Sequence, residues 1–306
     1  MSALVLCAAL IAPFLYAVTN HIDKILLEKY FKEGGVGTLM IVSSLLSVVV
    51  IPVAFLVDPT VLSVGDTEIA VLAFAGFLNL VLLWAYLQAM NSEEPTVVIV
   101  FYQLVPLLGL LMGNRLLGET ITLTQGVAMI LIMTGATVMT IATDENGRFT
   151  LHLKTVGYML IASLCWASQS TLFKMVALEE NVIRSLFWEN LAMVAFGIVL
   201  YCSVRRYRRS FLAAFRKNSA PILWLNVLNE MIYVAGSVMA AFVVMLIPVA
   251  LNLLMNSFQP IFVLVIGALI NRFIPGASTE AIGRRLPQKI IAIALTGVGA
   301  YLLGGS

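Results

Sequence analysis

The stretch PTVVIVFYQLVPLLGLLMGNRLLGETITLTQGVAMILIMTGATVMT, residues 95–140, decides the fold of this chain. It holds two apolar runs of about 20 residues, each long enough to cross roughly 30 Å of hydrocarbon as a helix. The short polar turn NRLLGE, residues 114–119, joins the two runs. Two such runs in succession predict a pair of membrane-spanning helices.

The composition extends this prediction to the whole chain. Of the 306 residues, 61% are hydrophobic and 11% are charged, and the mean hydropathy is +1.00. Soluble domains carry about 25% charged residues. The apolar residues form continuous runs and do not alternate with polar ones, which favours helices over a β-barrel. We therefore expect an all-α membrane protein.

The apolar runs give ten candidate transmembrane helices. Their approximate limits are 3–27, 36–57, 68–90, 95–114, 121–142, 154–177, 184–204, 220–244, 248–270 and 287–304. No basic residue precedes Lys24, so we expect no cleavable signal peptide.

The basic residues favour one orientation. With the amino terminus outside, fifteen of the eighteen Lys and Arg residues fall in inward loops, and Arg115, Lys174 and Arg184 fall outside. Positive residues gather on the cytoplasmic side of membrane proteins. We therefore expect a multi-pass protein with both termini outside. A bacterial inner (plasma) membrane is the expected location, although an organelle membrane would give the same pattern.

The most basic segment, RRYRRSFLAAFRK at 205–217, has two interpretations. It is a loop that sets the topology, or its Phe211, Leu212 and Phe215 lie in the membrane interface while its arginines meet anionic lipid.

Three features of the first half recur in the second half. They are the stripe Pro13, Tyr16, Asn20 and Lys24, repeated 150 residues later as Ser163, Trp166, Ser170 and Lys174; Asn79, repeated as Asn229; and the pair Pro95 and Pro106, matched by Pro248 and Pro260. Because each half has an odd number of spans, the second half must lie upside down relative to the first. Inverted repeats are typical of secondary transporters, with the site near the midplane. We predict five-helix repeats at 1–145 and 146–306, with the polar segment 143–154 at their boundary.

The sequence resembles the drug/metabolite transporter superfamily in its ten-span form with two EamA-type halves. The residues that carry the resemblance are Pro95, the turn Leu117, Gly118 and Glu119, and the following Gln125, Gly126 and Gly135. The second half has the turn NRFIPG, residues 271–276, and a longer insertion at 277–285 in place of the LGE triplet. The resemblance implies a transporter of small organic solutes, often an exporter, without a prosthetic group.

Glu230 is the strongest candidate for a functional residue. It lies about ten residues into the eighth span, where an ionisable side chain costs about 2.5–3.5 kcal/mol on insertion scales. Asn226, Tyr233 and Ser237 share its helix face. A carboxyl at this depth suits the exchange of a proton or the binding of a cationic group, and the alternative is a protonated side chain that bonds two helices. Its repeat counterpart is Leu80, so we expect an asymmetric site.

Amide side chains form a second candidate stripe on the ninth span. Asn252, Asn256 and Gln259 follow each other at spacings of 4 and 3, and Gln103 corresponds to Asn256 in the repeat. Such amides bind hydroxyl, amine or carboxylate groups, or they hold helices together. Tyr102, beside Gln103, is a candidate cavity wall.

The first and sixth spans supply further candidates for the cavity wall and its ends. Pro13, Tyr16, Asn20, Trp166, Gln169 and Ser170 are expected to line the cavity. Lys24 and Lys174 are candidate gates, with Asp23 or Glu28 as the partner of Lys24, unless both lysines extend to the membrane surface. Glu189 is a third candidate gate at the outer mouth, and a solvated acid in an interfacial aromatic belt is the alternative. Glu119 suits a structural role at the start of the fifth span.

These features favour a secondary transporter of small polar or amine-bearing metabolites, an exporter or exchanger, with proton coupling through Glu230 or none. The alternative is a flippase of the same fold for a lipid or lipid-linked headgroup. An intramembrane enzyme is disfavoured, because neither His21 nor His152 lies near a midplane acid and no HExxH, GxSxG or P-loop pattern occurs. We expect no cofactor, no metal, no nucleic-acid partner and a functional monomer in contact with lipid.

Overall fold

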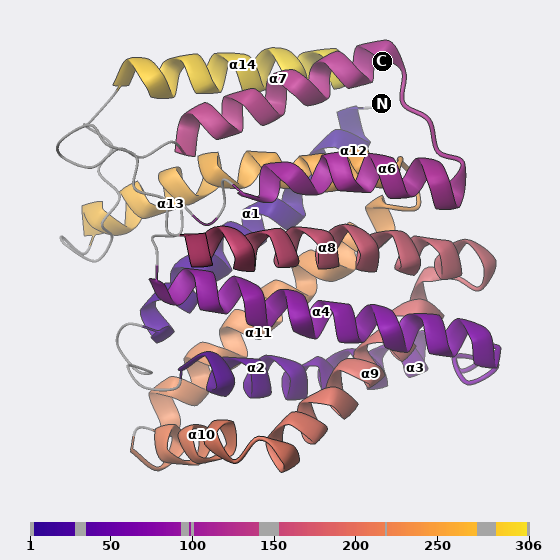
Figure 1. The fold of residues 1–306 in the computed structure, drawn as a ribbon, viewed down its shortest axis with the longest axis vertical. Helices are drawn as coiled ribbons and strands as arrows, with labels where there is room; N and C mark the ends of the chain where they lie inside the picture. The colour runs from indigo at the N-terminus through magenta and orange to yellow at the C-terminus, as the bar shows by residue number, and fades with distance from the viewer. Residues whose placement is uncertain are drawn as a thin grey trace.

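The computed structural model describes residues 3–27, 35–92, 98, 101–140, 153–217, 219–273 and 286–304. These residues form helices and no strand, as predicted for an all-α membrane protein (Figure 1). The bounds of the elements are α1 Ala3–Ile25, α2 Gly35–Leu46, η2 Ser47–Val49, α3 Val50–Val57, α4 Asp66–Ser92, η3 Phe101–Leu104, α6 Val105–Leu117, α7 Leu123–Thr140, α8 Leu153–Glu179, α9 Val182–Ser203, α10 Arg205–Lys217, α11 Ser219–Val243, α12 Val249–Leu254, η4 Met255–Phe258, α13 Gln259–Phe273 and α14 Leu286–Gly304.

Seven of the ten predicted spans are helical segments long and apolar enough to cross a membrane. They are Leu4–Ile25, Gly35–Val57, Asp66–Asn91, Leu153–Glu179, Val182–Ser203, Trp224–Val243 and Val249–Ile270. The predicted spans at 121–142 and 287–304 contain shorter apolar helices, Leu123–Val138 and Ile291–Leu303. The predicted span at 95–114 lies partly outside the described residues, and its described part is η3 with α6.

Prolines explain why two of the spans change from a 3₁₀ to an α-helix within the membrane. A proline has no N–H to bond the carbonyl four residues before it, so the preceding turn is free to tighten. In the first half η3 ends two residues before Pro106, and in the second half η4 ends two residues before Pro260. Both 3₁₀ turns therefore stand in the same place relative to the repeated prolines.

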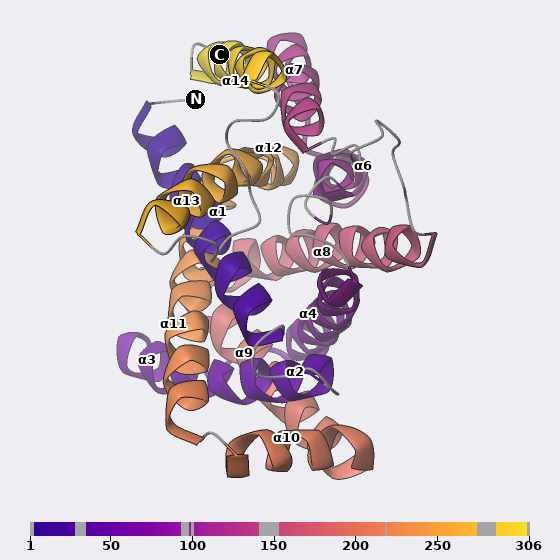
Figure 2. The same ribbon diagram turned by 90° about the vertical axis from the view of Figure 1, so that its left-hand side faces the viewer.

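The helices pack in pairs that match when the two halves are exchanged. Helix α1 packs on α11 and α8 packs on α4, which is the equivalent contact, while α7 packs on α14 (Figures 1 and 2). At this last contact a Cβ added to Gly135 would lie 2.8 Å from the carbonyl oxygen of Ala292, and a Cβ added to Gly299 would lie 2.9 Å from that of Ala128. Each helix thus offers one glycine to its partner, the small-residue packing common between membrane helices.

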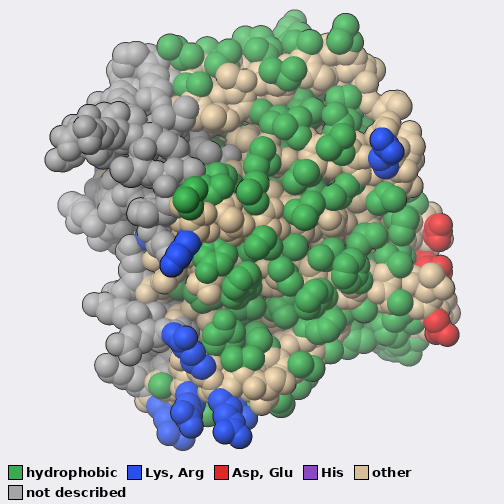
Figure 3. Space-filling model, viewed as in Figure 1, with side chains coloured by type: hydrophobic (Ala, Val, Ile, Leu, Met, Phe, Trp, Pro, Cys, Tyr) green, Lys and Arg blue, Asp and Glu red, His purple; other side chains and the backbone are tan. Residues whose placement is uncertain are grey.

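Charged side chains gather at two opposite edges of the molecule. Lys and Arg side chains gather over α10, and Asp and Glu side chains mark the opposite edge (Figure 3). Both chain ends lie on the side of the acidic edge, near the turn between α6 and α7 (Figure 1). The position of both ends on one side agrees with the even number of predicted spans. The outward assignment of the termini stays a prediction.

The basic segment 205–217 forms the helix α10 and is not an extended loop. It packs on α2, α9 and α11. A Cβ added to Gly37 of α2 would lie 2.2 Å from the ring of Tyr207, so the aromatic side chain rests directly on the α2 backbone. Arg205, Arg206 and Arg209 remain exposed, which fits the surface interpretation of this segment better than a free loop.

Candidate functional site

A cavity of about 130 Å³ lies between the helices of the two halves. Ligand pockets for drug-sized molecules occupy roughly 300–1,000 Å³, so this space suits a smaller solute. Its polar and aromatic lining residues are Tyr16, Thr19, Asn20, Asp23, Ser43, Asn79, Tyr86, Tyr102, Trp166, Gln169, Ser170, Phe173, Glu189, Asn229, Glu230, Tyr233, Ser237, Asn252, Asn256 and Gln259. Three of these are acids, and among the described residues no Lys, Arg or His lines the cavity.

Most of the predicted site residues come together in this cavity. Those that line it are Tyr16, Asn20, Tyr102, Trp166, Gln169, Glu189, Glu230, Tyr233, Asn252 and Asn256. Four predicted residues do not line it, namely Asn226, Gln103, Lys24 and Lys174. Pro13 lies within α1 and also does not line the cavity.

Glu230 occupies the wall that α11 contributes. Its side chain is buried, with 5% of the residue exposed, and it lies beside the Ser43 hydroxyl of α2. Tyr233 and Ser237 continue the same face along the cavity. Asn226 lies one turn before Glu230 and is also buried, but the cavity ends before that turn and Asn229 takes its place in the lining.

Asp23 is the main site residue that sequence reasoning missed, because it was assigned only as a partner of Lys24. Its Oδ1 accepts a hydrogen bond of 2.7 Å from the Asn229 side-chain amide. The Tyr86 hydroxyl lies 3.2 Å from Asp23 Oδ2 and 2.9 Å from Asn20 Oδ1. The signal was present in the helical spacing, since Asp23 lies three residues after Asn20 and seven after Tyr16 on the same face of α1.

Glu189 is a cavity residue and not a solvated acid of an interfacial belt. Only 5% of the residue is exposed, and the Gln169 side-chain amide of α8 donates a 2.6 Å hydrogen bond to its Oε1. The belt interpretation is wrong because α9 turns this side chain toward α8 and not toward the membrane surface. The neighbouring Trp188 does not line the cavity. Its indole N–H donates a 2.7 Å hydrogen bond to the Val61 carbonyl.

Aromatic rings connect the walls of the cavity. The Tyr16 ring lies 5.4 Å from Tyr233 and 6.3 Å from Trp166, measured between ring centroids. Trp166 in turn lies 4.7 Å from Tyr102, in an edge-to-face arrangement. These contacts join α1, α8, α11 and η3, so the rings form one continuous surface.

The predicted equivalence of Gln103 and Asn256 is wrong by one residue. The 3₁₀ turns η3 and η4 begin at Phe101 and Met255, so Tyr102 corresponds to Asn256 and both line the cavity. The interval between the repeated prolines is eleven residues in the first half and twelve in the second, and this extra residue misled the comparison. Gln103 is buried behind the cavity, with neither amide atom hydrogen-bonded within the described part of the chain.

Lys174 and Glu119 form a buried ion pair beside one end of the cavity. The Lys174 ammonium also donates a 2.8 Å hydrogen bond to the Ile247 carbonyl, and Glu119 Oε2 accepts a 2.8 Å bond from the backbone N–H of Val249. Lys174 is 6% exposed, so the prediction that it extends to the membrane surface is wrong. Glu119 has the predicted structural role, but at the amino terminus of α12 and not at its own helix.

Lys24 has a different environment from its repeat counterpart. Its ammonium lies 3.4 Å from the Met90 carbonyl at the end of α4. Asn229 and Tyr86 hydrogen-bond to Asp23, and Glu28, the other predicted partner of Lys24, lies outside the described residues.

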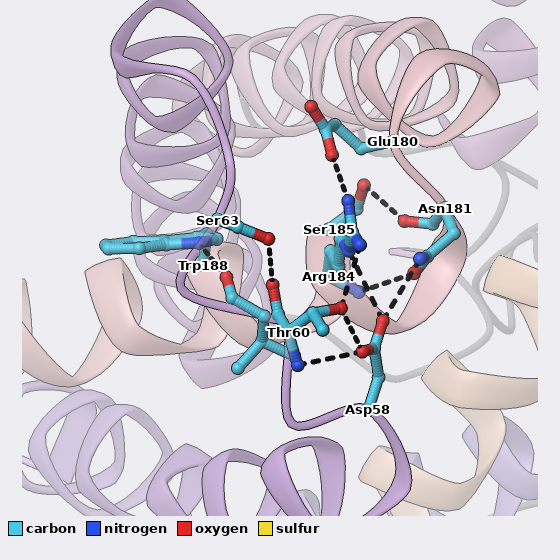
Figure 4. A network of polar contacts seen from close by, with 9 residues as sticks. Asp58, Thr60, Ser63, Glu180, Asn181, Arg184, Ser185 and Trp188 are labelled. Atoms are coloured by element: carbon cyan, nitrogen blue, oxygen red, sulfur yellow. Dashed lines mark hydrogen bonds and ion pairs between the residues drawn. The ribbon is translucent and has the colours of Figure 1, made fainter.

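A polar network fixes the loop between α3 and α4 to the start of α9 (Figure 4). The Arg184 guanidinium contacts Glu180 at 2.7 Å, Asp58 at 3.3 Å and the Thr60 hydroxyl at 2.8 Å. The hydroxyl and the backbone N–H of Thr60 both bind the Asp58 carboxylate, which lowers the pKa of Asp58 to about 2. This network joins the two halves of the chain outside the cavity.

The comparisons with known proteins agree with this architecture. Residues 3–141 match the EamA-like transporter family. The predicted resemblance to EamA-type transporters is thereby confirmed over residues 3–141. The apolar helices indicate a multi-pass membrane protein. A family of transporters is consistent with the expectation that the protein is not an enzyme.

One crystal structure of another protein shows the same fold over nearly the whole length. It superposes with a TM-score of 0.62 at 16% sequence identity, covering 99% of this chain and 97% of that chain. No curated protein matches this chain. The second half therefore shares the overall architecture although the family match ends at residue 141.

Proposed function

We propose that this protein is a secondary transporter of small polar or amine-bearing solutes, which alternates access by moving residues 1–145 against residues 146–306. The observation that supports this most is the cavity itself, whose walls come from both halves and whose lining has three carboxyl groups and, among the described residues, no basic side chain. Carboxylates without a basic partner attract cationic groups. The exchanged pairing of the helices supports the two-repeat division.

Glu230 is the proposed site of proton coupling. It is buried at the cavity wall, where Ser43 lies beside it. The other titratable groups that line the cavity are Asp23, Glu189, Tyr16, Tyr86, Tyr102 and Tyr233. A carboxyl that binds an amine in one state and a proton in the other couples the two movements, because the cavity favours a neutral total charge during the crossing. An exporter would then exchange an outgoing cation for an incoming proton.

The ion pair of Lys174 with Glu119 is the proposed closure at the acidic edge. It joins α8, the turn before α7 and the start of α12, close to Phe173 and Asn252 of the lining. With the predicted topology this edge faces outward. Lys24 at the other end and Glu189 within the cavity are the remaining proposed gate residues. We propose a functional monomer in a bacterial inner membrane, with both termini outside.

Uptake into proteoliposomes tests the proposal. A panel of amino acids, polyamines and amphiphilic cations is offered with and without a pH gradient, to wild type, to Glu230→Gln and to the control Glu179→Gln, which removes an exposed acid outside the cavity. We expect gradient-driven uptake of an amine by wild type and the control, and none by Glu230→Gln. Equal uptake by all three proteins would reduce Glu230 to a packing role. If wild type moves no solute, a lipid-flippase assay becomes the next experiment.

A further inference from the structure

The carboxyl groups of the cavity fall into two separate groups. Asp23 and Glu230 form the first, because the two carboxyl groups interact electrostatically. Asn229, the residue before Glu230, donates a 2.7 Å hydrogen bond to Asp23. Glu189 stands apart as the second and is held by Gln169. Different residues of α4 face the two groups: Tyr86 lies beside Asp23, and Gly76 lies beside the backbone of Glu189.

The positions of Tyr86 and Gly76 along helix α4 show how far apart these contacts lie. The Tyr86 hydroxyl lies 3.2 Å from Asp23, whereas a Cβ added to Gly76 would lie 2.8 Å from the backbone carbonyl of Glu189. Ten residues of α-helix separate Gly76 from Tyr86, which is about 15 Å along the axis at 1.5 Å per residue. Asn79 lines the cavity between these levels. The backbone of Glu189 and the carboxyl group of Asp23 therefore face different levels of α4.

An aromatic surface adjoins both groups, since Tyr233 interacts electrostatically with Glu230 and with Glu189. Tyr16, Tyr233 and Trp166 lie with ring centroids 5.4 and 6.3 Å apart, and all three line the cavity. Ring faces pack well against methylene groups and also attract cations. An apolar chain that joins two charged ends fits such a surface.

Buried oxygen atoms of the lining are free to accept further hydrogen bonds. Asn229 Oδ1, Asn256 Oδ1 and Gln259 Oε1 have no hydrogen-bond partner in the described part of the chain, and these residues are 6%, 7% and 2% exposed. The corresponding unpartnered donor is the amide nitrogen of Asn20. Because a primary ammonium group has three donors and no acceptor, it satisfies such oxygens better than a carboxylate or a hydroxyl does.

We propose that the cavity binds a linear diamine, with one ammonium group at Asp23 and Glu230 and the other at Glu189. This inference rests on the proposed transport function and names the substrate class for the same site. A monoamine occupies only one acidic group and leaves the other without a counter-charge. A zwitterion brings a carboxylate toward a second acid and is disfavoured. Specificity for diamines follows from the distance between the two acidic groups, with the rings filling the space between them.

Equilibrium binding to the purified protein in detergent tests this inference without any need for transport. The probes are cadaverine, its monoamine analogue pentylamine, and δ-aminovalerate, which carries a carboxylate in place of one amine. We expect cadaverine to bind at least tenfold more tightly than either analogue. Glu189→Gln should lower the cadaverine affinity to the level of pentylamine, while Glu179→Gln leaves it unchanged. Equal affinities of wild type for cadaverine and pentylamine would overturn the inference.

The fold of the variant and the transport function are checked separately. Retained pentylamine binding by Glu189→Gln shows that the variant is folded, so a loss of diamine preference then reports the missing carboxylate. Cadaverine counterflow in proteoliposomes gives the second readout. Tight diamine binding without counterflow would contradict the transport proposal and leave the binding site standing. Counterflow of both amines at equal affinity would contradict the diamine inference alone, and no amine binding at all would overturn both.

Discussion

The two repeat-equivalent lysines hold the two ends of the molecule in different ways. Lys174 is buried and binds the Glu119 carboxylate and the Ile247 carbonyl, whereas Lys24 lies 3.4 Å from the Met90 carbonyl at the end of α4. The contact of α7 with α14, in comparison, is the same from both sides, with Gly135 and Gly299 in equivalent roles. The fold repeats its helix packing, but the contacts described for these two lysines differ.

The contacts described at the two lysines differ in the free energy that each kind of contact contributes. A buried ion pair that loses one partner costs about 3–5 kcal/mol, because the remaining charge has no compensation. A hydrogen bond between an ammonium group and a carbonyl contributes about 1.5–3 kcal/mol at best and less at a long distance. The Lys174–Glu119 pair should therefore stabilise the closed state of the acidic edge.

The largest expected effect comes from removing each lysine in turn. Lys174→Met should lower the free energy of unfolding by about 3 kcal/mol, since it leaves the partly buried Glu119 carboxylate without a counter-charge. Lys24→Met is the matched comparison, because it removes the 3.4 Å contact of the Lys24 ammonium with the Met90 carbonyl. Thermal unfolding in detergent measures both. Equal losses in the two variants would show that the two lysines are energetically equivalent, contrary to the comparison.

Two substitutions of Glu119 separate its charge from its capping contact. Glu119→Gln keeps an oxygen that can accept from the Val249 N–H and loses the charge, whereas Glu119→Ala loses both. Loss of a helix cap costs about 1 kcal/mol. We expect the alanine variant to be less stable than the glutamine variant by about that amount, as measured by thermal unfolding. The same stability in both would remove the capping role.

Gly118 makes a smaller contribution to the same closure. It ends α6 with φ of 65°, a left-handed conformation, and directs the chain so that Glu119 reaches Lys174. No atom lies within 4 Å of an added Cβ, so the cost of Gly118→Ala is a backbone cost alone. We expect a loss of about 1 kcal/mol in thermal unfolding. Gly118→Asn, whose side chain tolerates this conformation, should lose less, and the reverse order would contradict the explanation.

The smallest effect concerns pH and the network around Asp58. The pKa of Asp58 is lowered to about 2, so its contribution to stability is complete above about pH 4 and disappears as the pH falls through 2. Between pH 4 and 2 the thermal midpoint of wild type should therefore fall more steeply than that of Asp58→Asn. The two proteins should show parallel profiles from pH 5 to 8. A difference in slope in that higher range would have to come from another group.

Much of the candidate site follows from helical spacing alone. Glu230 with Tyr233, and Tyr16 with Asn20, were predicted to share a face because residues three or four apart on a helix do so, and the cavity brings both pairs together. Residues that act across helices were less accessible to prediction. The contact of Asn229 with Asp23 joins positions 206 residues apart, and no local pattern indicates which helix faces which. The roles of these residues in binding stay predictions.

The sequence by itself determined the class of this protein and its apolar spans, and it predicted the internal repeat. These properties can be inferred from the order of residues along the chain. The thickness of a bilayer sets the length of an apolar run, and a buried charge is costly wherever it falls along that run. Only the tertiary structure decided that Lys174 binds Glu119, that Glu189 faces the cavity, and that Asp23 belongs to the site. Those outcomes depend on the rotation of each helix about its axis, which packing between the two halves fixes.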